Sequence, residues 1–497
     1  MLNFSESQTT RDRILRGAGL ALVSGLLALM VLGCNVGPNY ARPTTAAPQS
    51  YRGALAPDLP ATADPAKKAD ATAPAATLGE ENWQSVFTDP TLQQLITEAL
   101  ANNLDLTIAA KRVLEARAQV GIVRSQQLPT LGAGGSFTAL QLPQGLANTN
   151  SDGTKNDFIR GGGFSASAAW NLDFWGLYRR QTEAARAELL QSEWAQRATR
   201  ASLIEDLASA YFQLRSLDAQ LAITQNTIKA REDSLKLTQQ LESYGAGSRA
   251  DTRQAEELLF TAKADLPEIR RQVAVQENTI SILLGHAPSN IERGVEIADQ
   301  PHPSAVPTGL PSELLERRPD IRQAEATLMA ANARVGVAKA QFFPQISLTS
   351  MGGSASNQLN NIFAGQNAYW YAAGSLSQPI FAGGRIRSTY KYSQAQQEEM
   401  VATYRKAVLN ALKDVSNSLT AYGETRTRRE EQTRAVTSAT DAVRLARLRY
   451  AGGNTSYIEV LATDTDLYDA QLKLAQAQQQ EATSLVQLYA ALGGGWQ

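Results

Sequence analysis

The chain contains very few side chains of the kinds that catalyse reactions or hold metals. Its 497 residues include one cysteine, Cys34, and two histidines, His286 and His302. A zinc cluster, a Cys/His nucleophilic pair and a disulfide framework all need more of these residues than the chain has. The sequence therefore predicts no metal site, no cofactor and no enzymatic activity.

The position of Cys34 points to another chemistry, the attachment of lipid. Arginines near the N-terminus precede an apolar run, Ala18 to Leu32, of roughly 15 residues, which fits a signal-peptide core and is too short to span a membrane. The run ends in Leu32-Gly33-Cys34, which resembles a bacterial lipobox. We predict a signal peptide at 1–33 and a palmitate-bearing lipid anchor on Cys34. The alternative is an incidental cysteine in an ordinary signal peptide.

The residues after Cys34 predict its destination and a tether. In lipoproteins of this type an Asp in the next position is the usual inner-membrane retention signal, so Asn35 predicts the outer membrane. Residues 37–76 are dense in Pro, Ala and Thr, which predicts an extended, poorly packed segment. We assign 34–80 to this lipidated tether.

The composition of the whole chain favours long helices and excludes one class of partner. There are 47 basic and 48 acidic residues, so the chain has no electrostatic footprint for nucleic acid. Ala, Gln, Leu, Arg and Glu are abundant, and these residues favour helices. Such a chain is more typical of a structural or transport protein than of an enzyme.

Two prolines mark places where a helix is expected to become a strand. Pro129 and Pro344 each end a stretch rich in Ala, Arg and Val, because proline lacks the amide donor that a helix needs. After each proline the apolar residues alternate, which is the period of a strand. Setting Val120 on Val335 also aligns the two prolines, so the chain looks like two copies of one unit.

Each copy contains two strands and then a long helix that ends at a glycine turn. We predict strands at about 130–141, 162–175, 345–353 and 369–381, with apolar side chains facing one way and small or polar ones the other. A helix of some 65 residues would be about 100 Å long. The same turn residues recur in each copy, which places two helix-to-helix turns at equivalent positions: Gly245, Ser248 and Asp251, then Gly453, Ser456 and Glu459.

Four strands of this pattern resemble membrane strands, but they cannot stand in lipid as an open sheet. The edge amides and carbonyls would be unpaired in hydrocarbon. Closing a barrel from three chains would give twelve strands, and the long helices would continue it as a helical cylinder. The alternative for one hairpin is a soluble sheet with one face on a core.

The chain resembles the TolC-type outer membrane efflux factors, in the lipoprotein (NodT-like) branch that serves tripartite pumps. The resemblance covers nearly everything after the tether. It rests on four motifs: Trp83-x-x-x-Phe87-x-Asp89-Pro90, Arg317-Arg318-Pro319-Asp320-Ile321-Arg322-x-Ala324-Glu325, the Ala-Val-Gly helix ending at Phe343-Pro344, and Arg449-Tyr450-x-x-Gly453-x-x-Ser456.

The resemblance implies a fold that is mainly α with membrane β, built from a duplicated helix-strand-strand-helix-helix unit. It implies a homotrimer with a 12-stranded β-barrel continued by a long α-helical barrel, anchored in the outer membrane of a Gram-negative bacterium. The implied function is a passive exit duct for drugs or other small molecules. The implied partners are outer membrane lipid, a periplasmic adaptor and an inner-membrane RND-type pump.

The family closes its tunnel with polar and ionic contacts at the periplasmic tip. The matching positions here are Arg447, Tyr450, Gly453, Ser456, Glu459, Asp464, Gly245, Ser248 and Asp251. The chain departs from the family pattern at Ala462, where related channels often carry an Asp of an acidic ring; Asp464 and Asp466 follow. For any single charge among these, the alternative is an ordinary solvated helix face.

The segments follow from these assignments. They are a first repeat at 81–285, an equatorial connector at 286–311, a second repeat at 312–493 and a tail at 494–497. Three other functions stay open: a conduit of the same fold for type I protein secretion, a metal-ion efflux duct, and a coiled-coil surface or scaffold protein that is not a channel. With five Met and no His/Met cluster, the sequence gives little support to metal efflux.

Overall fold

The computed structural model describes residues 35–44, 48, 50–52, 77–141, 148–149, 155–156, 158–301, 303, 306–307 and 311–496. The predicted signal peptide, Cys34 and most of the predicted tether lie outside the described residues. His302 and the last residue, Gln497, also lie outside them.

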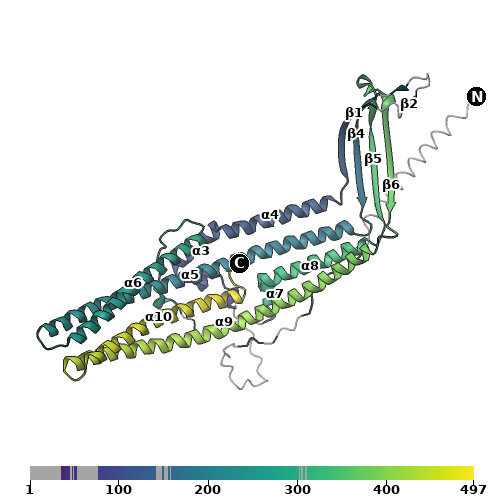
Figure 1. The fold of residues 1–497 in the computed structure, drawn as a ribbon. Helices are drawn as coiled ribbons and strands as arrows, with labels where there is room; N and C mark the ends of the chain where they lie inside the picture. Colours follow the sequence, from purple (N-terminus) through teal and green to yellow (C-terminus); the bar gives the residue numbers. More distant parts are fainter. Residues whose placement is uncertain are drawn as a thin grey trace, which may run out of the picture. The chain divides into compact units, whose positions relative to one another are not determined.

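Long helices and one sheet make up the described chain (Figure 1). The helices are η1 (Leu78–Glu80), α2 (Trp83–Val86), α3 (Pro90–Asn102), α4 (Leu104–Ser125), α5 (Leu177–Ser243), α6 (Arg249–Leu283), η2 (Ile297–Asp299), α7 (Leu314–Arg317), α8 (Pro319–Ala340), η3 (Leu359–Asn361), η4 (Gly365–Asn367), α9 (Arg385–Ala451) and α10 (Tyr457–Ala491). The strands are β1 (Thr130–Gln141), β2 (Asn148–Thr149), β3 (Lys155–Asn156), β4 (Phe158–Leu172), β5 (Gln345–Ser356) and β6 (Ala368–Ser377).

The duplication seen in the sequence is present in the element lengths. α5 and α9 each have 67 residues, and α6 and α10 each have 35. α4 and α8 each have 22 residues, and β1 and β5 each have 12. The chain therefore repeats one helix-strand-strand-helix-helix unit, and equivalent residues of the two copies can be compared.

The two proline junctions form as expected. α4 ends four residues before Pro129 and α8 ends four residues before Pro344, and a strand begins directly after each proline. Tryptophans from β4 and the turn after it close the junctions: Trp170 Nε1 donates to the Gln127 carbonyl at 3.0 Å, and Trp175 Nε1 donates to the Pro344 carbonyl at 2.8 Å. These bonds pair two backbone carbonyls of the short turns that lead from each helix into its strand.

The four long strands form one antiparallel sheet in the order β1-β4-β5-β6. The central pairing of β4 with β5 joins the first repeat to the second, as in the pair Trp170 and Leu348. Because residues directly opposite each other share a face, the register gathers most large apolar side chains on one face of the sheet. They are Leu131, Phe137, Phe164, Trp170, Leu348, Trp370 and Leu376. Ser165, Ser167, Ser347, Thr349 and Ser375 lie on the other face.

Three of the predicted strands have boundaries that were wrong by a few residues. The strand predicted at 162–175 is β4, which starts at Phe158 because Phe158 to Arg160 extend the pairing with β1. It ends at Leu172, and Asp173 accepts bonds from the backbone amides of Tyr178 and Arg179 at the start of α5. β5 continues to Ser356 and β6 ends at Ser377.

The helical pattern of the sequence predicts one continuous helix from Pro90 to about Gln127 and another from Pro311 to Phe343, and the structure breaks both. The helix expected from Pro90 to about Gln127 is interrupted at Asn103, whose side chain accepts a bond from the Leu106 amide. The helix expected from Pro311 onward is interrupted at Arg318, directly before Pro319. Both breaks fall at equivalent positions of the two repeats, since setting Val120 on Val335 sets Asn103 on Arg318.

The chain divides into two compact units that do not follow the repeats. The strand unit contains the described part of residues 1–43 with 114–190 and 325–402, and the hairpin unit contains the described part of 44–113 with 191–324 and 403–497. Each unit takes segments from both copies, because strands of one copy pair with strands of the other. The predicted repeats are thus not two compact domains.

The first residues after Cys34 are docked within the strand unit, which corrects the prediction that the chain is poorly packed from residue 37. The Val36 amide donates to the Trp175 carbonyl at 3.2 Å, and a Cβ on Gly37 would lie 2.5 Å from Gly336 Cα. Arg180, only 2% exposed, donates to Asn39 at 2.9 Å. Arg42 binds both oxygens of Glu325 at 2.7 Å. We call residues 35–42 the N-terminal strap.

Candidate functional site

The candidate site lies in the hairpin unit, where two helical hairpins meet. The first hairpin is α5 and α6 joined through Gly245, and the second is α9 and α10 joined through Gly453; both turns lie at the same end of the helices (Figure 1). Gly245 has φ +73° and Gly453 has φ +72°, a conformation that costs other residues energy. We call the region from these turns to Asp464 the tip.

The described structure brings several of the predicted tip residues together inside the second hairpin. Arg447 of α9 is 3.4 Å from Asp464 of α10, and Arg449 is 2.6 Å from Glu459. The Tyr450 ring packs 5.2 Å from the Tyr457 ring. Burial raises the pKa of the Tyr450 hydroxyl, and the Asp251 carboxylate raises it further.

The remaining predicted residues shape the turns. The Ser248 side chain accepts a bond from the Ala250 amide at 3.1 Å and so caps α6. Ser456 is the N-cap residue of α10 but makes no side-chain cap bond. Ala462 carries no charge, and Asp466 forms no ion pair with the described residues; the acidic group in the network is Asp464.

A small apolar cluster holds the two hairpins against each other at the tip. Ala255 of the first hairpin packs with residues of the second, namely Ala446, Tyr457 and Val460, and each is at most 4% exposed. Leu235, Tyr450 and Leu461 pack against this cluster. The contact between the two hairpins of one chain at the tip therefore has an apolar component.

The residue that connects the hairpins most strongly was missed by the sequence reasoning. Arg231 of α5 binds Asp464 of α10 at 2.9 Å, donates to the Leu258 carbonyl of α6 at 2.8 Å, and lies 5.3 Å above the Tyr468 ring. Its side chain is 5% exposed. Its Nη2 atom has no hydrogen-bond partner among the described residues, beside a cavity of about 10 Å³ that has room for one water.

Tyr468 continues this link along α10. Its hydroxyl lies 3.0 Å from Thr224 of α5 and 3.2 Å from Asp265 of α6. Further along, Ser216 of α5 donates to the Ala475 carbonyl at 3.0 Å. No motif marks these residues. The one signal in the sequence is that Arg231 aligns with Ala439 when Gly245 is set on Gly453, so the charge lies in only one copy.

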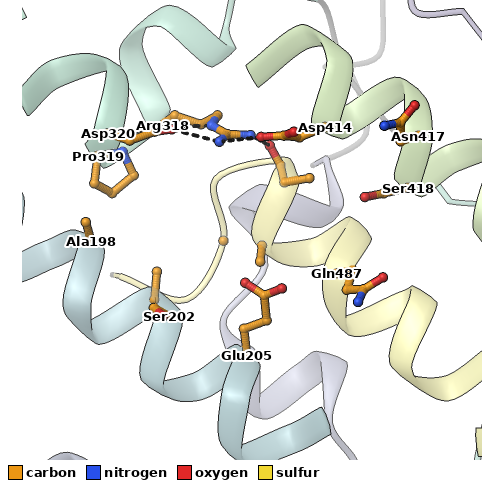
Figure 2. A pocket seen from close by; sticks show the side chains of 14 residues that line it. Ala198, Ser202, Glu205, Arg318, Pro319, Asp320, Asp414, Asn417, Ser418 and Gln487 are labelled. Carbon is orange, nitrogen blue, oxygen red and sulfur yellow. Dashed lines mark hydrogen bonds and ion pairs between the residues drawn. The ribbon is translucent and has the colours of Figure 1, made fainter. Parts of the chain in front are cut away.

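The Arg317-Arg318-Pro319-Asp320 motif has a separate place, at the joint where α8 begins and α10 ends (Figure 2). Arg318 donates to the Ala491 carbonyl at 3.1 Å, and it also binds Asp320 at 2.8 Å and Asp414 of α9 at 3.3 Å. These groups border a cavity of about 370 Å³ that Glu205 of α5 also lines. Burial raises the pKa of the Glu205 carboxyl, and the Asp206 carboxylate adds to the rise.

The first repeat builds the same joint with a neutral side chain. Asn103 donates to the Leu283 carbonyl at 2.9 Å, and Leu283 is equivalent to Ala491. In both joints a glycine with positive φ packs on the residue before the donor: a Cβ on Gly285 would lie 2.4 Å from the Asn102 carbonyl oxygen, and one on Gly493 would lie 3.2 Å from Arg317 Cβ. The joints therefore bind abutting helix ends.

Among the residues that the structure describes, no group of three or more His, Cys, Asp or Glu side chains is placed to hold a metal ion. Within the same residues, no helix is both long and apolar enough to cross a membrane.

Comparison with known proteins identifies the family. Residues 95–286 and 310–494 match the family described as "Outer membrane efflux protein". The chain is 35% identical over 470 residues to the antibiotic efflux pump outer membrane protein ArpC of Pseudomonas putida, which covers 94% of each chain. It is 31% identical over 473 residues to the cation efflux system protein CusC of Escherichia coli, over 95% of this chain and 98% of that one.

A solved structure agrees with these relatives. The open state of the MtrE outer membrane channel of Neisseria gonorrhoeae matches with a TM-score of 0.81 at 28% identity, over 93% of this chain and 99% of that one. The family is one of channel proteins rather than of enzymes. The chain belongs to the outer membrane efflux protein family, and it is an outer membrane channel component of a tripartite efflux system.

Proposed function

We propose that three copies of the chain form a closed duct through which small molecules leave passively. The observation that carries this is the sheet, whose end strands β1 and β6 each pair with one neighbour in the described chain. The face bearing Leu131 and Trp370, which are 83% and 81% exposed, suits lipid. Pairing β6 of one copy with β1 of the next removes every open edge, and three copies give twelve strands.

The experiment is to purify the full-length protein in detergent, crosslink it and count subunits on denaturing gels. The same sample is then inserted into planar bilayers for conductance. A ladder that ends at three subunits, together with discrete channels, supports the duct. A ladder that ends at two, or a protein that never conducts, contradicts it.

We also propose that Cys34 carries the lipid anchor. Cys34 lies outside the described residues, but Asn35 directly follows it and lies against Gly176, where β4 gives way to α5. The strap thus begins at the end of the sheet, next to where membrane is expected. Cys34→Ser should abolish metabolic labelling with palmitate and leave the trimer intact. Labelling that persists in this variant would rule out the anchor.

The cargo proposed for this duct is small organic molecules, delivered by an RND-type inner-membrane pump through a periplasmic adaptor. The support is the closer likeness to an antibiotic efflux protein than to a cation efflux protein, 35% against 31% identity. Cation efflux and type I protein secretion are the alternatives. A strain lacking the chain should become more sensitive to antibiotics and solvents; sensitivity to metal cations alone would favour cation efflux.

We propose, finally, that the tip is the gate of the duct. The ion pairs of Arg447 with Asp464 and of Arg449 with Glu459, together with the packing of Tyr450, support this. The double variant Tyr450→Phe, Arg447→Ala should raise single-channel conductance. Conductance equal to that of the natural protein would remove these two residues from the gate.

A further inference from the structure

A shallow cavity of about 420 Å³ lies on the sheet of the strand unit. The register places it on the face that bears Leu131 and Trp370, because two rows of opposite residues that line it belong to that face. One row is Trp170, Leu348 and Gly374, and the next is Ala168, Ser350 and Ala372. We call this depression the sheet cavity.

The sheet cavity exists because small residues stand where the same face otherwise carries large side chains. Along β6, Trp370 and Leu376 are 81% and 69% exposed and lie on either side of Ala372 and Gly374. Among the described residues that line the cavity, none is charged. Such a surface suits a hydrocarbon chain and offers no counter-charge to an ammonium or phosphate group.

The sheet cavity lies near the end of the sheet from which the long helices leave. Trp170, at its rim, donates to the Gln127 carbonyl just after α4. Leu348 follows Pro344 by four residues, so the two Cα atoms are at most about 14 Å apart. One leaflet of the hydrocarbon core of a bilayer is about 15 Å thick. In the proposed barrel the cavity is therefore at the depth of the leaflet on the helix side.

The N-terminal strap fixes the start of the mature chain at the same end of the sheet. The Val36 amide donates to the Trp175 carbonyl, and Arg180, which is buried, donates to the Val36 carbonyl at 3.4 Å. Asn35 lies against Gly176, directly after that tryptophan. Cys34 lies outside the described residues, but its peptide bond to Asn35 sets the two Cα atoms about 3.8 Å apart.

Trp175 connects this anchored end to both central strands of the sheet. The residue follows β4 by three positions, and its ring stacks on Phe343 with 4.8 Å between the ring centroids. Its Nε1 atom donates to the Pro344 carbonyl at 2.8 Å, directly before β5. The end of β4 and the start of β5 line the centre of the sheet cavity. A lipid on Cys34 would therefore begin below the two strands that form the cavity.

The length of chain between this point and the sheet cavity suits an acyl chain. Six residues separate Gly176 from Trp170, which is at most about 20 Å, and the turn at 174–175 shortens that distance. An acyl chain that fills one leaflet covers about 15 Å. A chain that starts at Cys34 and lies along β4 thus reaches the cavity.

We propose that the sheet cavity binds an acyl chain of the lipid carried by Cys34 of the same copy. This inference rests on the proposed anchor at Cys34. The strap holds that lipid beside the cavity through the bonds of Val36 and Arg180, whereas a free phospholipid can diffuse away. The lipid would then have a fixed place on the sheet in addition to its place in the bilayer.

The first experiment maps where the lipid lies. Cells that produce the full-length protein are fed a fatty acid with a photoreactive diazirine in the middle of its chain, and their membranes are irradiated. Mass spectrometry of digests then identifies the peptides joined to the acylated Cys34 peptide. Most crosslinks should fall in β5, β6 and the end of β4. Crosslinks spread evenly over the apolar face, including β1 around Phe137, would overturn the proposal.

The second experiment fills the sheet cavity. Ala372→Phe places a ring in it, and Ala373→Phe is the matched control, since the next residue of the same strand points to the other face. Ala372→Phe should remove most crosslinks between the Cys34 lipid and β5, and Ala373→Phe should leave them unchanged. Equal crosslinking in both variants would contradict the proposal. If Ala372→Phe does not assemble, the map of the natural protein decides.

The third experiment separates the protein's own lipid from a membrane phospholipid. Phospholipids that carry the same photoreactive chain should rarely crosslink to the cavity of the natural protein, and several-fold more often in Cys34→Ser, where the cavity is vacated. Equal phospholipid crosslinking in the two proteins would show that the cavity takes any lipid, and the inference would be wrong. An acylated Cys34 that never crosslinks to the cavity refutes the inference alone. A Cys34 peptide without any acyl chain refutes the anchor as well.

Discussion

At the scale of single residues, Asp464 illustrates how burial ranks two similar contacts. Arg231 and Arg447 both bind this carboxylate, at 2.9 and 3.4 Å, but one is buried and the other half-exposed. An arginine in a low-dielectric site that loses its counter-charge is left uncompensated, whereas an exposed one regains water. The two pairs should therefore differ in what their loss does to stability.

The first prediction compares the loss of the Arg231–Asp464 pair with the loss of the Arg447–Asp464 pair. Asp464→Asn should lower the free energy of unfolding by about 3 kcal/mol, since it leaves Arg231 buried without its partner. Arg447→Ala should cost less than about 1 kcal/mol. Denaturant titration of the trimer measures both. Equal losses in the two variants would show that burial does not rank these contacts.

A second prediction at this scale concerns Glu205, whose carboxyl has a raised pKa because burial disfavours its charged form. The folded state then binds the proton more tightly than the unfolded state. The stability that comes from this tighter proton binding is fully present below the pKa that Glu205 has in the unfolded state. It is lost as pH rises through the pKa that Glu205 has in the folded state. Glu205→Gln should thus raise the heat-dissociation temperature at pH 7, with a smaller gain near pH 4. A gain that grows toward pH 4 would contradict this sign.

Residue roles were the hardest part to obtain from the sequence. Arg447, Glu459 and Asp464 could be selected because a motif surrounds them, and the structure places each in an ion pair. Arg231 could not, because an arginine in the middle of a long helix resembles any solvated position. Only the fold, which lays α10 against α5, gives it a partner.

At the scale of elements, local signals worked where one residue determines backbone geometry. Pro129, Pro344, Gly245 and Gly453 gave the strand starts and the helix turns because their backbones restrict or permit specific angles. The break at Asn103 has no such signal. It forms because α6 ends there and its last carbonyls need a donor, which is a tertiary cause.

The joint at Asn103 and the joint at Arg318 are equivalent, so the first predicts which substitution of Arg318 preserves stability best. Arg318→Ala should lower the heat-dissociation temperature, since the Ala491 carbonyl and Asp414 both lose a donor. Arg318→Asn copies the joint of the first repeat and should restore roughly half of the loss, because an amide reaches the carbonyl but not Asp414. Asn103→Ala is the matched control in the other copy. An Arg318→Asn variant no better than Arg318→Ala would refute the equivalence of the joints.

At the scale of the whole molecule, the repeats are interleaved rather than placed side by side as separate domains. β4 of the first copy pairs along its length with β5 of the second, and both compact units contain segments of each copy. The sequence revealed the duplication but not this exchange, since pairing between distant strands leaves no local pattern. A single repeat lacks the neighbours that bury its apolar residues.

Residues 81–285 and 312–493, expressed separately, should therefore each fail to form a heat-resistant species, while the full chain succeeds. Exposed apolar surface and unpaired strands make such fragments prone to aggregate. Sedimentation and heat-modified gel mobility measure this. A soluble, cooperatively unfolding single repeat would show that the interleaving is dispensable.

The N-terminal strap has a consequence for the order in which the chain matures. Residues that leave the cell interior first, Tyr40 and Arg42, bind Glu325, which follows 285 and 283 residues later. Asn332, which binds the Pro38 carbonyl, also comes from the second copy. The N-terminal strap can therefore dock only after the second copy has been exported. During that delay the lipid proposed on Cys34, once inserted in a bilayer, would keep the unfinished chain at the membrane surface where its strands are needed.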